Sequence, residues 1–235
     1  MKKLFVYGLS IAMVAGAASC KKTSKGKLSN EWTVSSMENT SSSTNSNGDV
    51  STETMTIDGS TITIVQTDSP SGGSTTTTTN TGTVNSAKMT ISKDGTWSRD
   101  LDITIVSEDE FGGVTYTTTT NSVIAESGTW DFLNGVSKDF KKNERVVFNT
   151  LSSSSTSSST TEAGGTSSTS SSTDTDTYSE GEMSEIMVVV ESKGKELQMK
   201  AEESSTSTSS NTGGGSTTTS NSSASGMTTI TLTQE

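Results

Sequence analysis

The stretch MTISKDGTWSRDLDITI, residues 89–105, decides the fold of this 235-residue chain. Met89 and Ile91 alternate with polar residues before the turn Lys93-Asp94-Gly95, and Trp97 begins a similar alternation after it. A period of two places the apolar side chains of a strand on one face. A Gly-containing turn between two such runs is typical of a β-hairpin. The sequence therefore predicts two antiparallel strands joined at this turn.

The same alternation recurs along the chain, and no segment after residue 19 has the spacing of an amphipathic helix. The apolar residues of the alternating faces are candidates for the core or for the lining of a cavity. They are Trp32, Met55, Ile57, Ile62, Ile64, Met89, Ile91, Trp97, Leu101, Ile103, Trp130, Phe132, Phe148, Ile186, Val188, Leu197, Met199, Ile230 and Leu232. We expect an all-β fold.

The turns fall into short and long classes that alternate along the chain. This alternation holds if residues 114–133 form one strand with a bulge or bend at Ser127-Gly128, and if 134–143 form a turn at the base. In a meander, alternate turns lie at the same end. We therefore predict about ten antiparallel up-and-down strands closing into a barrel, with residues 166–191 as one strand and the long hairpin arms at one end.

Composition limits how much of the chain packs into a core. The sequence contains 47 Ser and 45 Thr, and apolar residues make up only 27%. Four stretches, about 39–53, 67–86, 151–182 and 203–226, are almost entirely small and polar. Long Thr-rich arms, disorder and O-linked glycans are all compatible with them. We expect residues 151–182 and 203–226 to be frayed, because an isolated two-stranded arm is marginal in water.

The N-terminus has the features of an export signal. Lys2 and Lys3 precede an apolar run, and the small residues 16–19 lead directly to Cys20, the single cysteine. This arrangement resembles the lipobox of bacterial lipoproteins, which implies cleavage after residue 19 and acylation of Cys20. We expect a signal peptide at 1–19, a lipidated tether at 20–29 and one domain at 30–235, anchored in the cell envelope at the outer membrane.

The residues give no sign of catalysis. Without histidine and with one cysteine, the chain lacks the groups for disulfides, Cys/His zinc sites and Ser-His-Asp triads. Glu108, Asp109 and Glu110 form a run in one turn rather than a pair held across a cleft, and Asp174 and Asp176 lack the spacing of an EF-hand. We expect no enzymatic activity, metal or cofactor, and the net charge of −11 argues against nucleic acid.

Two alternatives remain open at this point. Trp32, Trp97 and Trp130 are either packed core residues or the lining of a ligand cavity, for which ten strands would leave more room than eight. The apolar face points either inward or, in an outer-membrane barrel, outward. Few aromatic residues, a polar C-terminal end and the expected acylation of Cys20 favour a soluble, tethered barrel. We expect it to be a monomer.

Several segments together resemble the lipocalin-like lipoproteins of Bacteroidota. These segments are LSNEWTVSS (28–36), MTISKDGTWSRD (89–100), ESGTWDF (126–132), ERVVFN (144–149), SEIMVVVESKGKELQMKAEE (184–203) and ITLTQE (230–235). The resemblance implies a small antiparallel barrel or curled sheet on an acylated tether, in a family mostly of unassigned function. Our leading functional hypothesis is an envelope protein that binds a small apolar or amphipathic ligand. The alternative is a structural or surface-display protein whose Ser/Thr-rich arms are the functional part.

Overall fold

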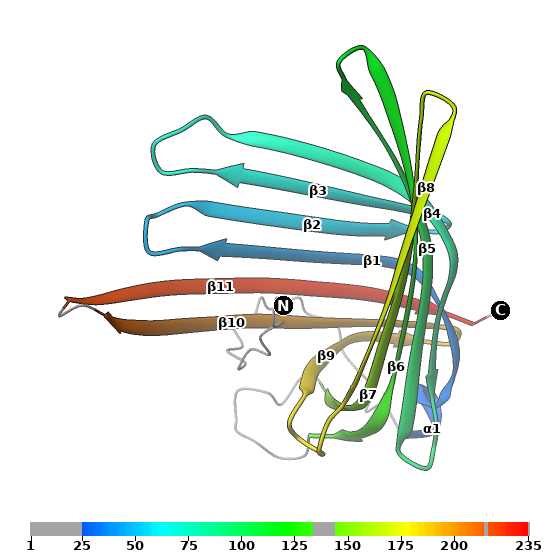
Figure 1. Ribbon diagram of the computed structural model, residues 1–235. Coiled ribbons are helices and arrows are strands. Elements are labelled where there is room, and N and C mark those ends of the chain that lie inside the picture. Colours follow the sequence, from blue (N-terminus) through cyan, green and yellow to red (C-terminus); the bar gives the residue numbers. More distant parts are fainter. Residues whose placement is uncertain (1–24, 134–143, 214–215, 235) are drawn as a thin grey trace.

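Antiparallel strands and one helical turn make up most of the described chain (Figure 1). The structure is a computed structural model that describes residues 25–133, 144–213 and 216–234, with side chains at all of these except 206–221. The signal peptide expected at 1–19, Cys20 and the turn expected at 134–143 lie outside the described residues. The prediction of an all-β, antiparallel, up-and-down fold is confirmed, and the strands close into a ring-like sheet.

Eleven strands follow the short helix α1 in chain order. The elements are α1 (Lys25–Leu28), β1 (Asn30–Thr44), β2 (Val50–Asp58), β3 (Thr61–Ser69), β4 (Thr76–Ile91), β5 (Thr96–Phe111), β6 (Val114–Phe132), β7 (Arg145–Ala163), β8 (Thr166–Thr177), β9 (Ser184–Lys193), β10 (Glu196–Gly213) and β11 (Ser216–Thr233). The segment 166–191 is thus two strands and not one, because the chain turns between β8 and β9 around Gly181, which has a φ of 83°.

The base of the molecule is a closed ring of eight strands. Its order is β1–β4–β5–β6–β7–β9–β10–β11, and the last strand pairs again with β1. The hairpin β2–β3 joins the sheet between β1 and β4 farther from the base, and β8 pairs with the outer part of β7. A ring of eight strands is just wide enough for side chains to fill.

The arms leave the base in two directions instead of one. The hairpins β1–β2, β3–β4 and β10–β11 extend one way, and β5–β6 and β7–β8 cross them at a steep angle (Figure 1). Register shifts interrupt the pairing of β1 with β11 between Val34 and Ser36, and of β4 with β5 between Val84 and Ser86. Bulges bend and twist a strand, so such shifts favour a divergence of the arms.

The arms are strands, and the prediction that residues 151–182 are frayed is wrong for residues 151–177. Residues 152–163 of β7 pair with β8 on one side, and residues 116–132 of β6 pair with β7 on the other. The second fraying prediction, for 203–226, is also wrong for the described backbone, which pairs in register between β10 and β11. Lateral pairing joins the hairpins into wider sheets, which are more stable than isolated hairpins.

One hydrophobic core fills the ring at the base. Its fully buried members include Ile57, Ile62, Leu197 and Leu232. Helix α1 closes the base from below: Leu28 is 1% exposed, and the Lys25 ammonium pairs with the Asp131 carboxylate of β6 at 2.9 Å. The packed part of the molecule therefore begins inside the segment expected to be a tether.

Candidate functional site

The three tryptophans lie in the core and anchor its walls to the backbone. Each indole Nε1 donates a hydrogen bond to a backbone carbonyl oxygen. The acceptors are Leu28 for Trp32 at 2.9 Å, Asn149 for Trp97 at 3.1 Å, and Ser92 for Trp130 at 2.8 Å. Each indole is 6% exposed or less. Buried tryptophans with satisfied N–H groups are packing residues.

Most of the other predicted inward-facing residues also lie in the core. Ile57, Ile62, Met89, Ile91, Ile103, Phe148, Leu197, Met199, Ile230 and Leu232 are buried. Met55, Ile64, Leu101 and Phe132 are half-buried and pack against them. The Trp97 and Phe148 rings meet edge to face with centroids 5.4 Å apart. The side chains of the base are therefore in mutual contact within the ring.

The face predicted for β9 is wrong. Ile186 and Val188 are only half-buried, whereas Met187 and Val189 are each 2% exposed and belong to the core. Apolar residues occupy both faces of IMVVV, so periodicity alone does not choose between them. Pairing of Val146 with Met187 sets the face, because Val146 is itself fully buried.

A cluster of charged side chains faces the interior above the core, and the sequence analysis did not identify it. Arg99 of β5 donates through Nε and Nη2 to one Glu126 oxygen of β6, at 2.9 and 2.5 Å. Glu185 of β9 and Glu203 of β10 are electrostatically coupled to this pair. Arg99 is on the same face of β5 as Trp97 and Leu101. The two-residue period of the strand therefore indicates that the Arg99 side chain points inward.

The environment of this cluster perturbs two ionisation equilibria. Burial raises the pKa of Glu185, and Glu203 and Glu126 add to this, while Arg99 opposes it. Burial acts to lower the pKa of Arg99, but the charges of Glu126 and Glu185 outweigh it and hold that pKa above its ordinary value. The Arg99 guanidinium therefore lies among three carboxylates. The charged form of Glu185 is disfavoured by burial.

We expect Glu185→Gln to raise the stability of the protein at pH 8. A carboxyl whose pKa is higher in the folded than in the unfolded chain binds more protons when folded, so its contribution to stability falls as the pH rises through the folded pKa. The gain should shrink on acidification and vanish below the ordinary value of 4.5. Thermal unfolding of both proteins from pH 4 to 8 measures this difference. Glu108→Gln, at an exposed arm position, is the control, and equal pH profiles for all three proteins would show that Glu185 is not desolvated.

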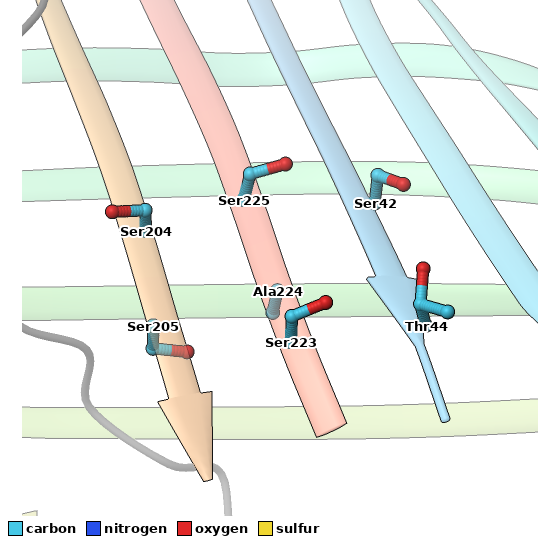
Figure 2. A pocket seen from close by; sticks show the side chains of 7 residues that line it. All are labelled: Ser42, Thr44, Ser204, Ser205, Ser223, Ala224 and Ser225. Atoms are coloured by element: carbon cyan, nitrogen blue, oxygen red, sulfur yellow. The ribbon is translucent and has the colours of Figure 1, made fainter. Parts of the chain in front are cut away.

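A pocket lies on the arms, away from the core. It has a volume of about 440 Å³ and is lined by Ser42, Thr44, Ser204, Ser205, Ser223, Ala224 and Ser225 (Figure 2). The lining comes from the neighbouring strands β1, β10 and β11 and includes none of the predicted cavity residues. Six of its seven lining residues carry a hydroxyl group.

The acidic residues considered in the sequence lie on the arms. Glu108, Asp109 and Glu110 are exposed beside the tip of β5–β6, and Asp174 and Asp176 are exposed near the end of β8. Within the described residues, no group of three Asp, Glu, His or Cys side chains is arranged to hold a metal ion.

Comparison with known proteins adds no family or relative. No family model, curated protein or solved structure matches the chain. In the described part of the chain, no helix is both long and apolar enough to span a membrane.

Proposed function

We propose that the protein is a lipid-anchored, non-enzymatic scaffold of the cell envelope that displays its polar hairpin arms. The observation that carries this proposal is the separation of core from arms. Core residues occupy the base, while β8 is exposed along its whole length, residues 166–177. Fixing the backbone costs about 1–2 kcal/mol per residue, so an ordered strand such as β8, which contributes no residue to the core, is best explained by a role of its own.

Hydroxyl pairs support the order of the arms. Thr118 faces Thr161 at 3.0 Å and Thr120 faces Ser159 at 2.9 Å between β6 and β7, and Thr160 faces Thr169 at 3.0 Å between β7 and β8. Cross-strand Thr and Ser hydrogen bonds contribute roughly 0.2–1 kcal/mol each. The arms thus have a regular hydroxyl-rich surface that water and polar partners can reach.

We expect Cys20→Ala to abolish membrane association, since the proposed acyl chains on Cys20 are the anchor. Several chains on one residue exceed the marginal, reversible binding of a single chain. Partitioning between detergent and aqueous phases measures the change, with the wild-type chain from the same host as the control. A Cys20→Ala chain that still enters the detergent phase would refute the lipoprotein proposal.

The display proposal predicts that the arms are reachable from outside the cell. Ser171 in β8 and Ser46 in the β1–β2 turn are both exposed. In intact host cells, Ser171→Cys and Ser46→Cys should each react with a membrane-impermeant maleimide. The wild type should not react, because its single cysteine is acylated. Labelling that appears only after the outer membrane is disrupted would mean that the arms face the periplasm, which contradicts display.

Binding of a small apolar ligand is the second candidate. It is favoured by Met55, Ile64, Leu101 and Ile105, which face inward at the edge of the core but are only partly buried. Native mass spectrometry of the protein purified from its own host tests this candidate. A bound small molecule that is lost in Leu101→Glu would support it, and ligand-free protein would leave display as the better proposal.

A further inference from the structure

Strand β8 lies at an edge of the sheet for its whole length. Among the described residues it pairs with β7 alone, over twelve consecutive positions from Thr166 to Thr177. The next strand in sequence, β9, pairs instead with the base of β7 at residues 145–149 and with β10. Within the described chain, the outward backbone N–H and C=O groups of β8 therefore have no strand beside them.

This edge has few of the devices that usually prevent edges from pairing with other chains. Such devices are charged side chains, lysine above all, proline, a bulge, or a very short strand. The sequence of β8, TSSTSSSTDTDT, contains neither lysine nor proline, and its pairing with β7 has no register shift. The two aspartates at one end, Asp174 and Asp176, are its charged residues.

We propose that β8 pairs edge to edge with β8 of a second copy of the chain, in antiparallel orientation. The positions of the charges favour this orientation. Parallel pairing in register would set each aspartate against its own copy, and like charges directly opposite are destabilising. Antiparallel pairing centred on Ser171 sets Asp174 against Ser168 and Asp176 against Thr166 of the second copy. Pairing centred on Ser172 sets Asp174 against Ser170 and Asp176 against Ser168.

Symmetry restricts the register of such a pair. Two identical antiparallel strands in one sheet are related by a two-fold axis perpendicular to the sheet. Cross-strand neighbours point to the same face, so the axis lies midway between one residue and the same residue of the second copy. The largest overlap of two twelve-residue strands that meets this condition pairs eleven residues and places that residue at Ser171 or Ser172.

The resulting interface continues a pattern already present within the chain. Thr169 and Thr173 contact Thr160 and Thr156 of β7 through hydroxyl groups at 3.0 and 3.2 Å. In either register these two threonines lie opposite Ser or Thr of the second copy. The row of facing hydroxyl groups between β7 and β8 therefore continues across the two-fold axis. The sheet β5–β6–β7–β8 of one copy then becomes continuous with that of the next. This inference goes beyond the display proposal and departs from the expected monomer.

Disulfide formation in the purified full chain tests the pairing. Single cysteine variants cover the centre of β8, namely Ser170→Cys, Ser171→Cys, Ser172→Cys and Thr173→Cys. After mild oxidation, non-reducing electrophoresis should show one strong maximum of dimer within this series, since one residue faces its own copy within disulfide range. The wild type reports dimers that form through its native cysteine, and the exposed turn variant Ser46→Cys reports dimers from random collision.

Other patterns would overturn the proposal. Equal dimer at all four positions indicates parallel pairing, and dimer no stronger than in Ser46→Cys indicates a free edge. As a second measurement, sedimentation of the chain without added cysteine should show concentration-dependent dimers that Ser171→Lys with Ser172→Lys abolishes. Retention of those dimers would place the interface elsewhere. Both measurements use purified protein, so their outcome is independent of the face of the membrane on which the arms lie.

Discussion

Trp97→Ala is expected to lower the free energy of unfolding by about 3–5 kcal/mol, the usual cost of removing a large buried aromatic side chain. The indole is 6% exposed and lies edge-on to Phe148. Its loss also leaves the Asn149 carbonyl without the donor that now lies 3.1 Å away. Domains of this kind have a total stability of about 5–15 kcal/mol, so the variant should be close to unfolding. Urea denaturation followed by circular dichroism measures the change.

Phe111→Ala is the matched control for this prediction. Phe111 is at the tip of β5–β6 and is 79% exposed. Removing a comparable aromatic ring there should change stability by no more than about 0.5 kcal/mol, as for most surface substitutions. Similar losses for the two variants would mean that Trp97 is not part of a packed ring.

The strands and most of the core could be predicted from the sequence because both depend on a local period of two. Trp97, Ile62 and Leu232 lie on strands in which apolar and polar residues alternate, and all three are buried. The sequence predicts a bulge or bend at Ser127-Gly128, and the pairing of β6 with β7 shifts register at this point, but the extra residue, Leu151, lies on β7. Local patterns sufficed wherever one face was clearly apolar and the other clearly polar.

The face of β9 and the order of the arms could not be predicted in this way, because both depend on partners far away in the sequence. Met187 is buried by its pairing with Val146, which lies on β7, two strands earlier in the chain. The prediction of frayed arms treats each arm as an isolated hairpin. In the structure, β7 pairs with β6 on one side and with β8 on the other. Three or more paired strands are much more stable than two, and composition does not show how many hairpins join.

The charged cluster was missed for a different reason. Neither Arg99 nor Glu126 is singled out in the sequence analysis, although Arg99 lies two positions from both Trp97 and Leu101 and therefore shares their face. In the ladder between β5 and β6, Arg99 is directly opposite Glu126. An inward-facing pair of opposite charges at directly opposite positions can be predicted from the sequence once the hairpin register is known. The interaction with Glu185 and Glu203 cannot be predicted in this way, because it depends on the closure of the ring through β9 and β10.

Gly128→Ala is expected to destabilise the protein by about 3 kcal/mol or more, at the upper end of what overpacking costs. A Cβ atom at this position would overlap the Asn149 carbonyl oxygen and would lie 2.9 Å from the Asn149 carbonyl carbon and 3.0 Å from the Leu151 nitrogen. All three are backbone atoms of β7, so no side chain can rotate away to make room. The Asn149 oxygen also accepts the Trp97 indole bond, so moving it disturbs the core wall and the β6–β7 ladder together.

Substitutions at two other glycines are the controls for the destabilisation expected at Gly128. A Cβ at Gly72 meets nothing within 4 Å, and one at Gly226 would lie 3.2 Å from the Thr40 carbonyl oxygen. Gly72→Ala should therefore leave the thermal unfolding midpoint unchanged, Gly226→Ala should lower it slightly, and Gly128→Ala should lower it most. The backbone of β7 approaches Gly128 where the register of β6 and β7 shifts. A Gly128→Ala protein as stable as Gly72→Ala would show that β7 does not lie this close to Gly128.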